Sequence, residues 1–217
     1  MARLYKYYSI DDDVKFQRIL DLLETNEIYL SDGKDFNDPF DIRVTSRKNK
    51  KLNFVKKFRV LCLTSSYRNK LMWSHYADAH QGICITIETL TDLIYPVFYT
   101  RERVYDDTNL DLLLSKHNKR SVIKKFVKPY DMISKKKLGY VKDSTWVYEN
   151  EYRIVFYDKE IKDLIDGERL KVKISKVYLG NRIAFEKENK IKKICALKHI
   201  DVSKISFTDD GYAIRVN

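Results

Sequence analysis

Two glutamates and an arginine recur at every second position in the segment WVYENEYRIVFY, residues 146–157. The alternation of side-chain types predicts a β-strand, in which residues two apart point to the same face. Glu149, Glu151 and Arg153 are therefore expected on one face, near Trp146. Paired carboxylates can stabilise a developing positive charge and activate an acceptor, while a guanidinium can hold a phosphate. The alternative is an exposed row of ion pairs, which contributes little to stability.

A second stretch, residues 61–88, predicts a strand, a short helix and another strand. Apolar residues lie at helical spacing over residues 72–80, and Gly82 is expected to end the helix. Isoleucines at alternate positions of residues 82–87 have the period of a strand.

Three residues of this helix, Trp73, His75 and Tyr76, are candidates for contacting a ligand. The alternative for Trp73 and Tyr76 is that they pack in the core, which is the commoner role of aromatic residues on a helix. His75, Asp78 and His80 do not have the spacing of a metallohydrolase helix, and a third ligand is not evident. We therefore expect no metal here.

The motif FNDPF, residues 36–40, is a strong turn signal, because Asn and Asp side chains bond their own backbone and proline fixes φ. Asn37 and Asp38 are either part of the site or only part of the turn. An N-terminal strand at 4–8 is followed by a helix that one of the aspartates at 11–13 caps and Asn26 ends. The predicted apolar stripe of that helix is Val14, Ile19, Leu22 and Leu23. Further strands are expected at 28–30, 172–180, 205–208 and 212–216, and helices at 108–137 and 185–197.

Strands outnumber helices and adjoin one another, so the sequence predicts an α+β fold. We expect a mixed, mainly antiparallel sheet core flanked by helices, with a basic helical insertion. The length of 217 residues suits a single domain, residues 1–217, with this basic lobe at about 108–142.

The formal net charge of +11 is concentrated in residues 116–142, which hold ten Lys or Arg and one acid, Asp131. Such a segment favours an anionic partner such as nucleic acid, although a solvated helical face is the alternative. The chain shows neither the apolar region of a signal peptide nor a run long enough to span a membrane. Its three cysteines lie in apolar runs and are expected to be reduced, as in a cytoplasmic protein.

Several enzyme classes lack support in the sequence. The chain has six glycines and no GxGxxG motif, which argues against a P-loop or Rossmann nucleotide enzyme, and it has no GxSxG elbow. A Mg²⁺-dependent nuclease would need clustered acids. Asp38, Glu149 and Glu151 are the only candidates, and nothing in the sequence places Asp38 near the other two.

Four motifs together resemble a widespread bacterial family that is catalogued as a domain of unknown function. They are Leu4-Tyr5-Lys6-Tyr7, the FNDPF turn at 36–40, the segment MWSHYADAHQGICI at 72–85, and Lys142 followed by WVYENEYR at 146–153. The chain departs from the family pattern at Cys62-Leu63-Thr64, where C-F-S is usual. The resemblance covers most of the chain.

The layout of this family looks like a divergent ADP-ribosyltransferase fold, in which a late strand carries the catalytic glutamate. The resemblance implies NAD as a substrate and Glu149 or Glu151 as the catalytic residue. Lys142 and Arg153 would hold the pyrophosphate, and aromatic residues would stack on the nicotinamide or adenine. The residues expected to contact NAD are Lys6, Tyr7, Ser31, Asn37, Asp38, Trp73, His75, Tyr76, Lys142 and Arg153.

Two hypotheses follow. The first is an NAD-dependent ADP-ribosyltransferase that acts as a bacterial toxin or antiphage defence effector on nucleic acid or protein, with a neutralising antitoxin-like protein as a further partner. The second is a non-enzymatic module that binds nucleic acid or protein and has a degenerate site. In both, the residues expected to bind nucleic acid are Lys124, Lys125, Lys135, Lys136 and Lys137.

Overall fold

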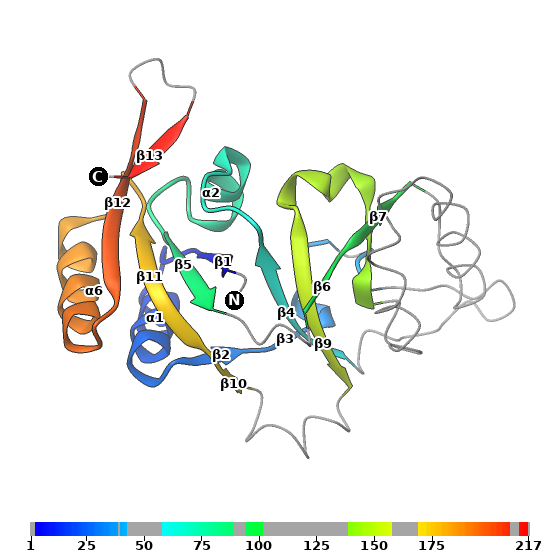
Figure 1. Ribbon diagram of the computed structural model, residues 1–217, viewed down its shortest axis with the longest axis horizontal. Helices are drawn as coiled ribbons and strands as arrows, with labels where there is room; N and C mark the ends of the chain where they lie inside the picture. Colours follow the sequence, from blue (N-terminus) through cyan, green and yellow to red (C-terminus); the bar gives the residue numbers. More distant parts are fainter. Residues whose placement is uncertain are drawn as a thin grey trace, which may run out of the picture.

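The computed structural model describes residues 3–38, 40–42, 58–88, 94–101, 139–157, 169–208 and 213–216. The helix predicted at 108–137 and the lysines predicted to bind nucleic acid lie outside these residues, as does most of the predicted basic lobe. In the described part of the chain, a mixed, mainly antiparallel sheet of nine strands carries helices on its faces (Figure 1). The fold is therefore α+β, as the sequence predicts.

The main sheet is built from strands of the start, the middle and the end of the chain. Neighbouring strands are antiparallel except β11 and β12, which are parallel and are joined through a helix. From one edge to the other the strands are β13 (Ile214–Val216), β12 (Asp201–Phe207), β11 (Lys173–Leu179), β5 (Ile83–Glu88), β1 (Arg3–Tyr8), β4 (Phe58–Thr64), β9 (Glu151–Tyr157) and β6 (Tyr95–Pro96), with β3 (Ser31–Asp32) also pairing with β4.

Two small sheets stand beside the main one. In the first, β10 (Arg169–Lys171) pairs antiparallel with β2 (Glu27–Tyr29). In the second, β7 (Phe98–Thr100) pairs parallel with β8 (Val141–Asp143). Residues 144–149, which follow β8 directly, contact both strands of this second pair and contribute to the candidate site.

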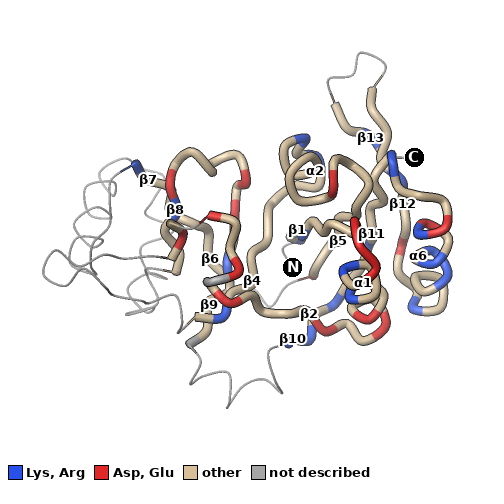
Figure 2. The backbone as a smooth tube through the Cα atoms, turned by 180° about the vertical axis from the view of Figure 1, so that it is seen from behind, with Lys and Arg blue, Asp and Glu red and all other residues tan. Residues whose placement is uncertain are grey.

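The two faces of the main sheet are used differently, because side chains alternate along each strand. Leu4 and its cross-strand partner Ile87 point into the main apolar core, which α1 (Asp13–Thr25) and α6 (Phe185–Leu197) cover. Tyr7 and its partner Cys84 point to the opposite face, where α2 (Lys70–Tyr76) packs on them. The helix α6 has the predicted bounds and carries several lysines (Figure 2), most of which are exposed.

Local signals at the ends of α1 agree with the prediction. Asp12 is the N-cap, and its side chain accepts a hydrogen bond from the backbone N–H of Lys15 at 2.7 Å. Asn26 ends the helix in the left-handed conformation with φ of 58°. The predicted apolar stripe is wrong at one position, because Val14 is exposed and Phe16 is buried in its place.

The helix predicted at 72–80 is shorter and begins earlier. It is α2, Lys70–Tyr76, and the side chain of Asn69 caps its N-terminus. The chain leaves the helix at residues 78–80, which all have positive φ, so Gly82 does not end the helix as expected. Gly82 instead lies where β1 and the end of the helix come too close for a side chain.

The strand predicted at 146–157 is also shorter. Residues 144–149 form a 3₁₀ helix, η6 (Ser144–Glu149), and Asn150 turns the chain through the left-handed region with φ of 46° before β9 begins. Glu149 is therefore not on the strand with Glu151 and Arg153. It belongs to a separate element that approaches the same face of the sheet.

A seam divides the main sheet between β1 and β4. All six residues of β1 pair with β5, but only Tyr5 pairs with β4, opposite Thr64. Beyond that pair the strands separate, and the ammonium of Lys6 donates a hydrogen bond to the carbonyl of Cys62 at 3.1 Å. A side chain thus replaces part of the backbone ladder at the seam.

The three cysteines are free, in agreement with the prediction. Cys84 and Cys195 are buried, whereas Cys62 is half-buried beside the seam. Among the described residues, no helix has the length and apolar character needed to cross a membrane.

Substitution of Gly82 by alanine should destabilise the protein strongly. The new methyl group would lie 2.1 Å from the carbonyl oxygen of Tyr8 and 2.9 Å from the Cα of Ala77, so backbone would have to move. We expect a loss of about 2–3 kcal/mol in the free energy of unfolding, measured by urea denaturation. Gly139→Ala is the matched control. It would meet a methyl group of Val155 at 2.9 Å, which can adjust, so an equal loss in both variants would contradict this account.

Candidate functional site

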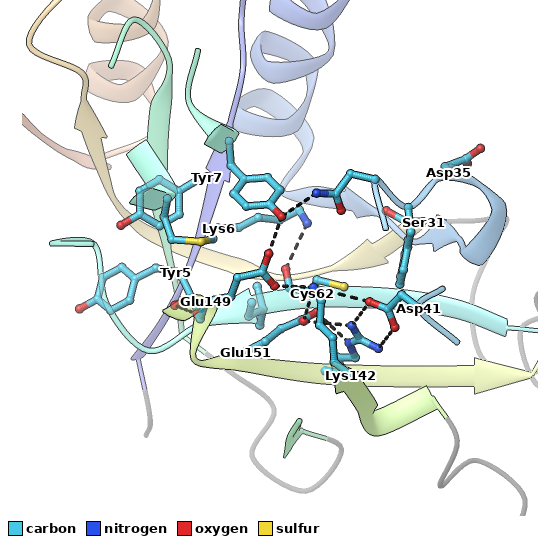
Figure 3. A pocket seen from close by; sticks show the side chains of 17 residues that line it. Tyr5, Lys6, Tyr7, Ser31, Asp35, Asp41, Cys62, Lys142, Glu149 and Glu151 are labelled. Atoms are coloured by element: carbon cyan, nitrogen blue, oxygen red, sulfur yellow. Dashed lines mark hydrogen bonds and ion pairs between the residues drawn. The ribbon is translucent and has the colours of Figure 1, made fainter. Parts of the chain in front are cut away.

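A cavity of about 230 Å³ lies over the seam between β1 and β4 (Figure 3). Its walls come from β1, β3 and the segment that follows it, β4, α2, β8, η6 and β9. The structure brings most of the predicted catalytic and NAD-binding residues together here. Those that line the cavity are Lys6, Tyr7, Ser31, Asn37, Tyr76, Lys142, Glu149, Glu151 and Arg153.

Arg153 is fully buried and bonded through every N–H of its guanidinium. It donates to both oxygens of Glu151, at 2.7 and 2.9 Å, and to both oxygens of Asp41, at 2.9 and 2.6 Å. A fifth hydrogen bond of 2.9 Å goes to the carbonyl of Gly139. Because a guanidinium has five N–H donors, none remains for a phosphate. The structure therefore shows no free donor on Arg153 for the pyrophosphate that it was predicted to hold. The alternative of an exposed row of ion pairs is wrong, because all three residues are buried.

Glu151 stays ionised because positive charges surround its carboxylate. Burial alone would raise the pKa of this carboxyl group, but the charges of Arg153 and Lys142 lower it to about 2. Its Oε1 accepts from Arg153 and its Oε2 accepts from both Arg153 and Lys142, the latter at 3.1 Å. Glu151 is consequently an ionised and largely saturated acceptor.

Glu149 contacts the same ammonium group, that of Lys142, but its other surroundings differ from those of Glu151. One of its oxygens accepts from Lys142 and the other from the hydroxyl of Tyr76. Burial raises the pKa of Glu149, and the charge of Lys142 only partly opposes this effect. The two neighbouring carboxylates thus have different pKa values, raised for Glu149 and lowered for Glu151. Such a difference lets one group exchange protons while the other stays charged.

Lys142 joins the two glutamates and remains charged. It is buried, and it also lies 3.5 Å from Asp41. Burial alone would lower the pKa of Lys142, but the surrounding carboxylates, led by Glu151, raise it. The ring of Trp146 lies 5.1 Å from the ammonium and covers it.

Neutral side chains fix the junction between η6 and β9. The hydroxyl of Thr64 donates to the carbonyl of Glu149 at 2.6 Å, and the hydroxyl of Tyr99 accepts from the backbone N–H of Glu151 at 2.8 Å. Asn69 donates to the carbonyl of Tyr148 at 2.5 Å. Thr64 can make its contact despite departing from the family pattern, because a threonine hydroxyl donates as a serine hydroxyl does.

In the FNDPF turn, Asn37 contributes to the site, whereas Asp38 stabilises the turn. Asn37 donates to the hydroxyl of Tyr76 at 2.9 Å, so the turn touches the partner of Glu149. Asp38 accepts from the backbone N–H of Phe40 at 2.8 Å and does not line the cavity. For Asp38 the structure thus favours the turn alternative.

Trp73 and His75 are not brought into the cavity either. Trp73 is fully buried, donates to the carbonyl of Tyr67 at 2.7 Å, and packs edge-on against Tyr7 with 5.2 Å between ring centroids. The core alternative therefore holds for Trp73. His75 is exposed, and its ring centroid lies 6.2 Å from that of Tyr148.

The most important residue that the sequence did not identify is Asp41. It accepts two of the hydrogen bonds of Arg153 and is almost completely buried. Its one signal was its place, one residue after the FNDPF motif, and a lone acid after a turn suggests nothing specific. Thr64, at which the chain departs from the family pattern, also lines the cavity. The other lining residues that the sequence did not identify are Tyr5, Asp35, Phe36, Cys62, Leu63 and Met72.

The carboxylates of the site are directed at cations of the protein itself. In the described part of the chain, no three His, Cys, Asp or Glu side chains form a group that could hold a metal ion. The nuclease hypothesis required Asp38 beside the two glutamates, and Asp38 instead bonds its own turn.

Comparison with known proteins gives one match. The model of a family described as "Protein of unknown function (DUF2971)" matches residues 72–154, which is less than half of the chain. The match includes both glutamates, Lys142 and Arg153, so a domain of unknown function is confirmed there. No curated protein and no solved structure matches the chain.

Replacing Arg153 by methionine should destabilise the protein in a pH-dependent way. The variant leaves Glu151 and Asp41 buried without their partner, which costs about 3–5 kcal/mol at pH 7. In the native protein the low pKa of Glu151 contributes stability that is present above about pH 4.3, the value of a free glutamate, and is lost as the pH falls toward 2. The stability difference between the two proteins should therefore narrow at pH 3.5.

Urea denaturation at pH 7 and at pH 3.5 measures this difference. Arg18→Met, an exposed position on α1, is the matched control and should lose little at either pH. A loss in Arg153→Met that stays the same at both pH values would show that the charge pairing does not cause it.

Proposed function

We propose that the protein cleaves the bond between nicotinamide and ribose in NAD and transfers ADP-ribose to an acceptor. One observation carries the proposal: two glutamates at a single cavity share the ammonium of Lys142 but differ in pKa and in free bonding capacity. Cleavage of this bond passes through a ribosyl centre with oxocarbenium character. A carboxylate placed beside the ribose stabilises that charge.

Glu149 is the glutamate that meets the ribose in this proposal. Each carboxylate oxygen offers about two acceptor positions. The acceptor positions of Glu151 are occupied by hydrogen bonds from Arg153 and Lys142, and the thiol of Cys62 also contacts this carboxylate. Glu149 has Lys142 and Tyr76 as its only side-chain partners among the described residues, which leaves it capacity for a ribose hydroxyl. Glu151 then acts as a positioning residue that holds Lys142 in place.

The likeness to ADP-ribosyltransferases supports the proposal at the level of layout. A first strand bearing Lys6 and Tyr7, a strand ending at Thr64 and a late carboxylate all border one cavity. The order of these elements along the chain is analogous to that of ADP-ribosyltransferases, and a shared layout does not by itself determine an activity. The chemistry of the carboxylate pair is the stronger support.

The acceptor in this proposal is a nucleic acid. Residues 116–142 hold ten Lys or Arg and a single acid, a composition that attracts polyanions. By the same analogy, the protein is a toxin or an antiphage defence effector, and a neutralising protein is a suitable partner.

Substitution of Glu149 by glutamine should abolish release of nicotinamide from NAD while leaving the protein folded. Loss of one charge-stabilising group typically lowers the rate about 10²–10³-fold. Chromatography of nicotinamide after incubation with NAD measures the rate, and thermal unfolding checks the fold. Glu186→Gln, exposed in the first turn of α6, is the matched control and should retain the native rate. Full turnover in Glu149→Gln would exclude Glu149 as the catalytic residue, whereas no turnover by the native protein would favour the binding-module hypothesis.

The rate should also depend on pH through Glu149. Because burial raises the pKa of Glu149, activity should fall with decreasing pH at a midpoint above 4.3, the value of a free glutamate. The hydroxyl of Tyr76 lowers this pKa, so Tyr76→Phe should move the midpoint further upward. Profiles of kcat/KM for NAD between pH 4 and 8 test this. A midpoint that is the same in both proteins would exclude Glu149 as the titrating group.

A further inference from the structure

The cavity is too small to enclose a whole dinucleotide. Its volume of about 230 Å³ lies below the 300–1,000 Å³ of typical small-molecule sites, although about half of a dinucleotide fits such a space. If the carboxylate pair receives the nicotinamide riboside half, the remaining half must lie on a surface continuous with the cavity. This step rests on the function proposed above, whereas the surface itself is defined by its own contacts.

The acidic end of the cavity is a poor place for phosphates. The acidic residues Asp35, Asp41, Glu149 and Glu151 line the cavity, and Figure 3 shows Asp41, Ser31 and Asp35 on the side away from Tyr5 and Tyr7. The cations there are occupied. Arg153 has no free N–H, Lys142 is held by carboxylates, and Lys6 bonds a backbone carbonyl. A pyrophosphate would meet repulsion without a free positive partner.

Tyrosines extend from the other end of the cavity. Tyr5 lines the cavity, and its ring centroid lies 5.5 Å from that of Tyr67. Tyr67 in turn stacks on Tyr178, with centroids 4.0 Å apart and planes within 7°. Tyr5 and Tyr67 are both partly exposed, while Tyr178 is buried beneath. We call these three residues with Arg68 and Lys176 the tyrosine platform.

Two cations of the platform face its rings and not a carboxylate. The guanidinium of Arg68 lies 5.2 Å from the centre of the Tyr67 ring and donates to its hydroxyl at 2.9 Å. The ammonium of Lys176 lies 5.4 Å from the centre of the Tyr178 ring. Within the described residues neither cation has an acidic partner, so both remain able to pair with a ligand anion. Aromatic faces beside unpaired cations suit a ligand that combines a base with phosphates.

We propose that the tyrosine platform binds the adenine and phosphate half of a nucleotide whose other half enters the cavity. The base stacks on Tyr5 and on the Arg68–Tyr67 pair, and Arg68 and Lys176 neutralise the phosphates. Tyr5 belongs to both the cavity and the platform, so it connects the two halves of the site. Phosphate recognition thus moves from Lys142 and Arg153 to cations on the opposite side of the seam.

Binding of ADP, which has a base and phosphates but no nicotinamide, tests the platform directly. Isothermal titration should show that Arg68→Gln and Tyr67→Leu each weaken ADP binding at least about tenfold, the effect of losing one charge-assisted or stacking contact. Lys193→Gln, an exposed lysine of α6, is the matched control and should bind ADP as the native protein does. Nicotinamide riboside, which lacks both adenine and phosphate, should bind the native protein and Arg68→Gln equally.

The outcomes separate this inference from the proposed function. No binding of ADP to the native protein, or equal binding to the native protein and both variants, overturns the platform whatever the protein does to NAD. Binding of ADP that depends on Arg68 and Tyr67 supports the platform even if NAD is not cleaved, and the cleavage proposal alone then fails. If NAD is cleaved, Arg68→Gln should raise KM more than it lowers kcat, because Arg68 does not line the cavity in which the bond breaks in this proposal.

Discussion

The burial of Arg153 is the constraint on which the site depends. A guanidinium at the centre of a protein is tolerated only when each donor has a partner, because an uncompensated buried charge costs several kcal/mol. Glu151, Asp41 and Gly139 supply those partners from three separate parts of the chain. Satisfying one side chain therefore fixes the end of the FNDPF segment, the approach to β8 and the start of β9 relative to one another.

The same pairing determines how the other charges behave. Since Arg153 holds Glu151 ionised, Lys142 has a permanent counterion and stays protonated although it is buried. Glu149 then shares a cation that is already partly neutralised, and burial raises its pKa. The contrast between the glutamates comes from their positions and not from their chemistry. A single turn at Asn150 produces that difference, because it takes Glu149 off the strand.

Features that depend on neighbours in sequence were predictable, and features that depend on distant contacts were not. The cap at Asp12, the left-handed Asn26, the alternation of β5 and the bounds of α6 follow from local chemistry. The pattern of residues 146–157 also placed Glu151 and Arg153 on one face. It could not reveal the 3₁₀ helix before them, because Glu149, Glu151 and Arg153 keep the alternating pattern of a strand although a tight turn at Asn150 separates the first from the other two. Asp41 was missed because its significance comes from distant partners, chiefly Arg153, 112 residues away.

The seam between β1 and β4 has a consequence for the dimensions of the site. In a continuous sheet, the spacing of neighbouring strands is set by the backbone ladder at about 4.8 Å and cannot be adjusted by side chains. Here one residue pair and side-chain contacts such as Lys6–Cys62 join the two halves of the sheet, so the width of the gap depends on the length and charge of single side chains. Changes at Lys6 could therefore widen or narrow the cavity while every strand keeps its own register. Related chains could in this way accommodate ligands of different size on one unchanged scaffold.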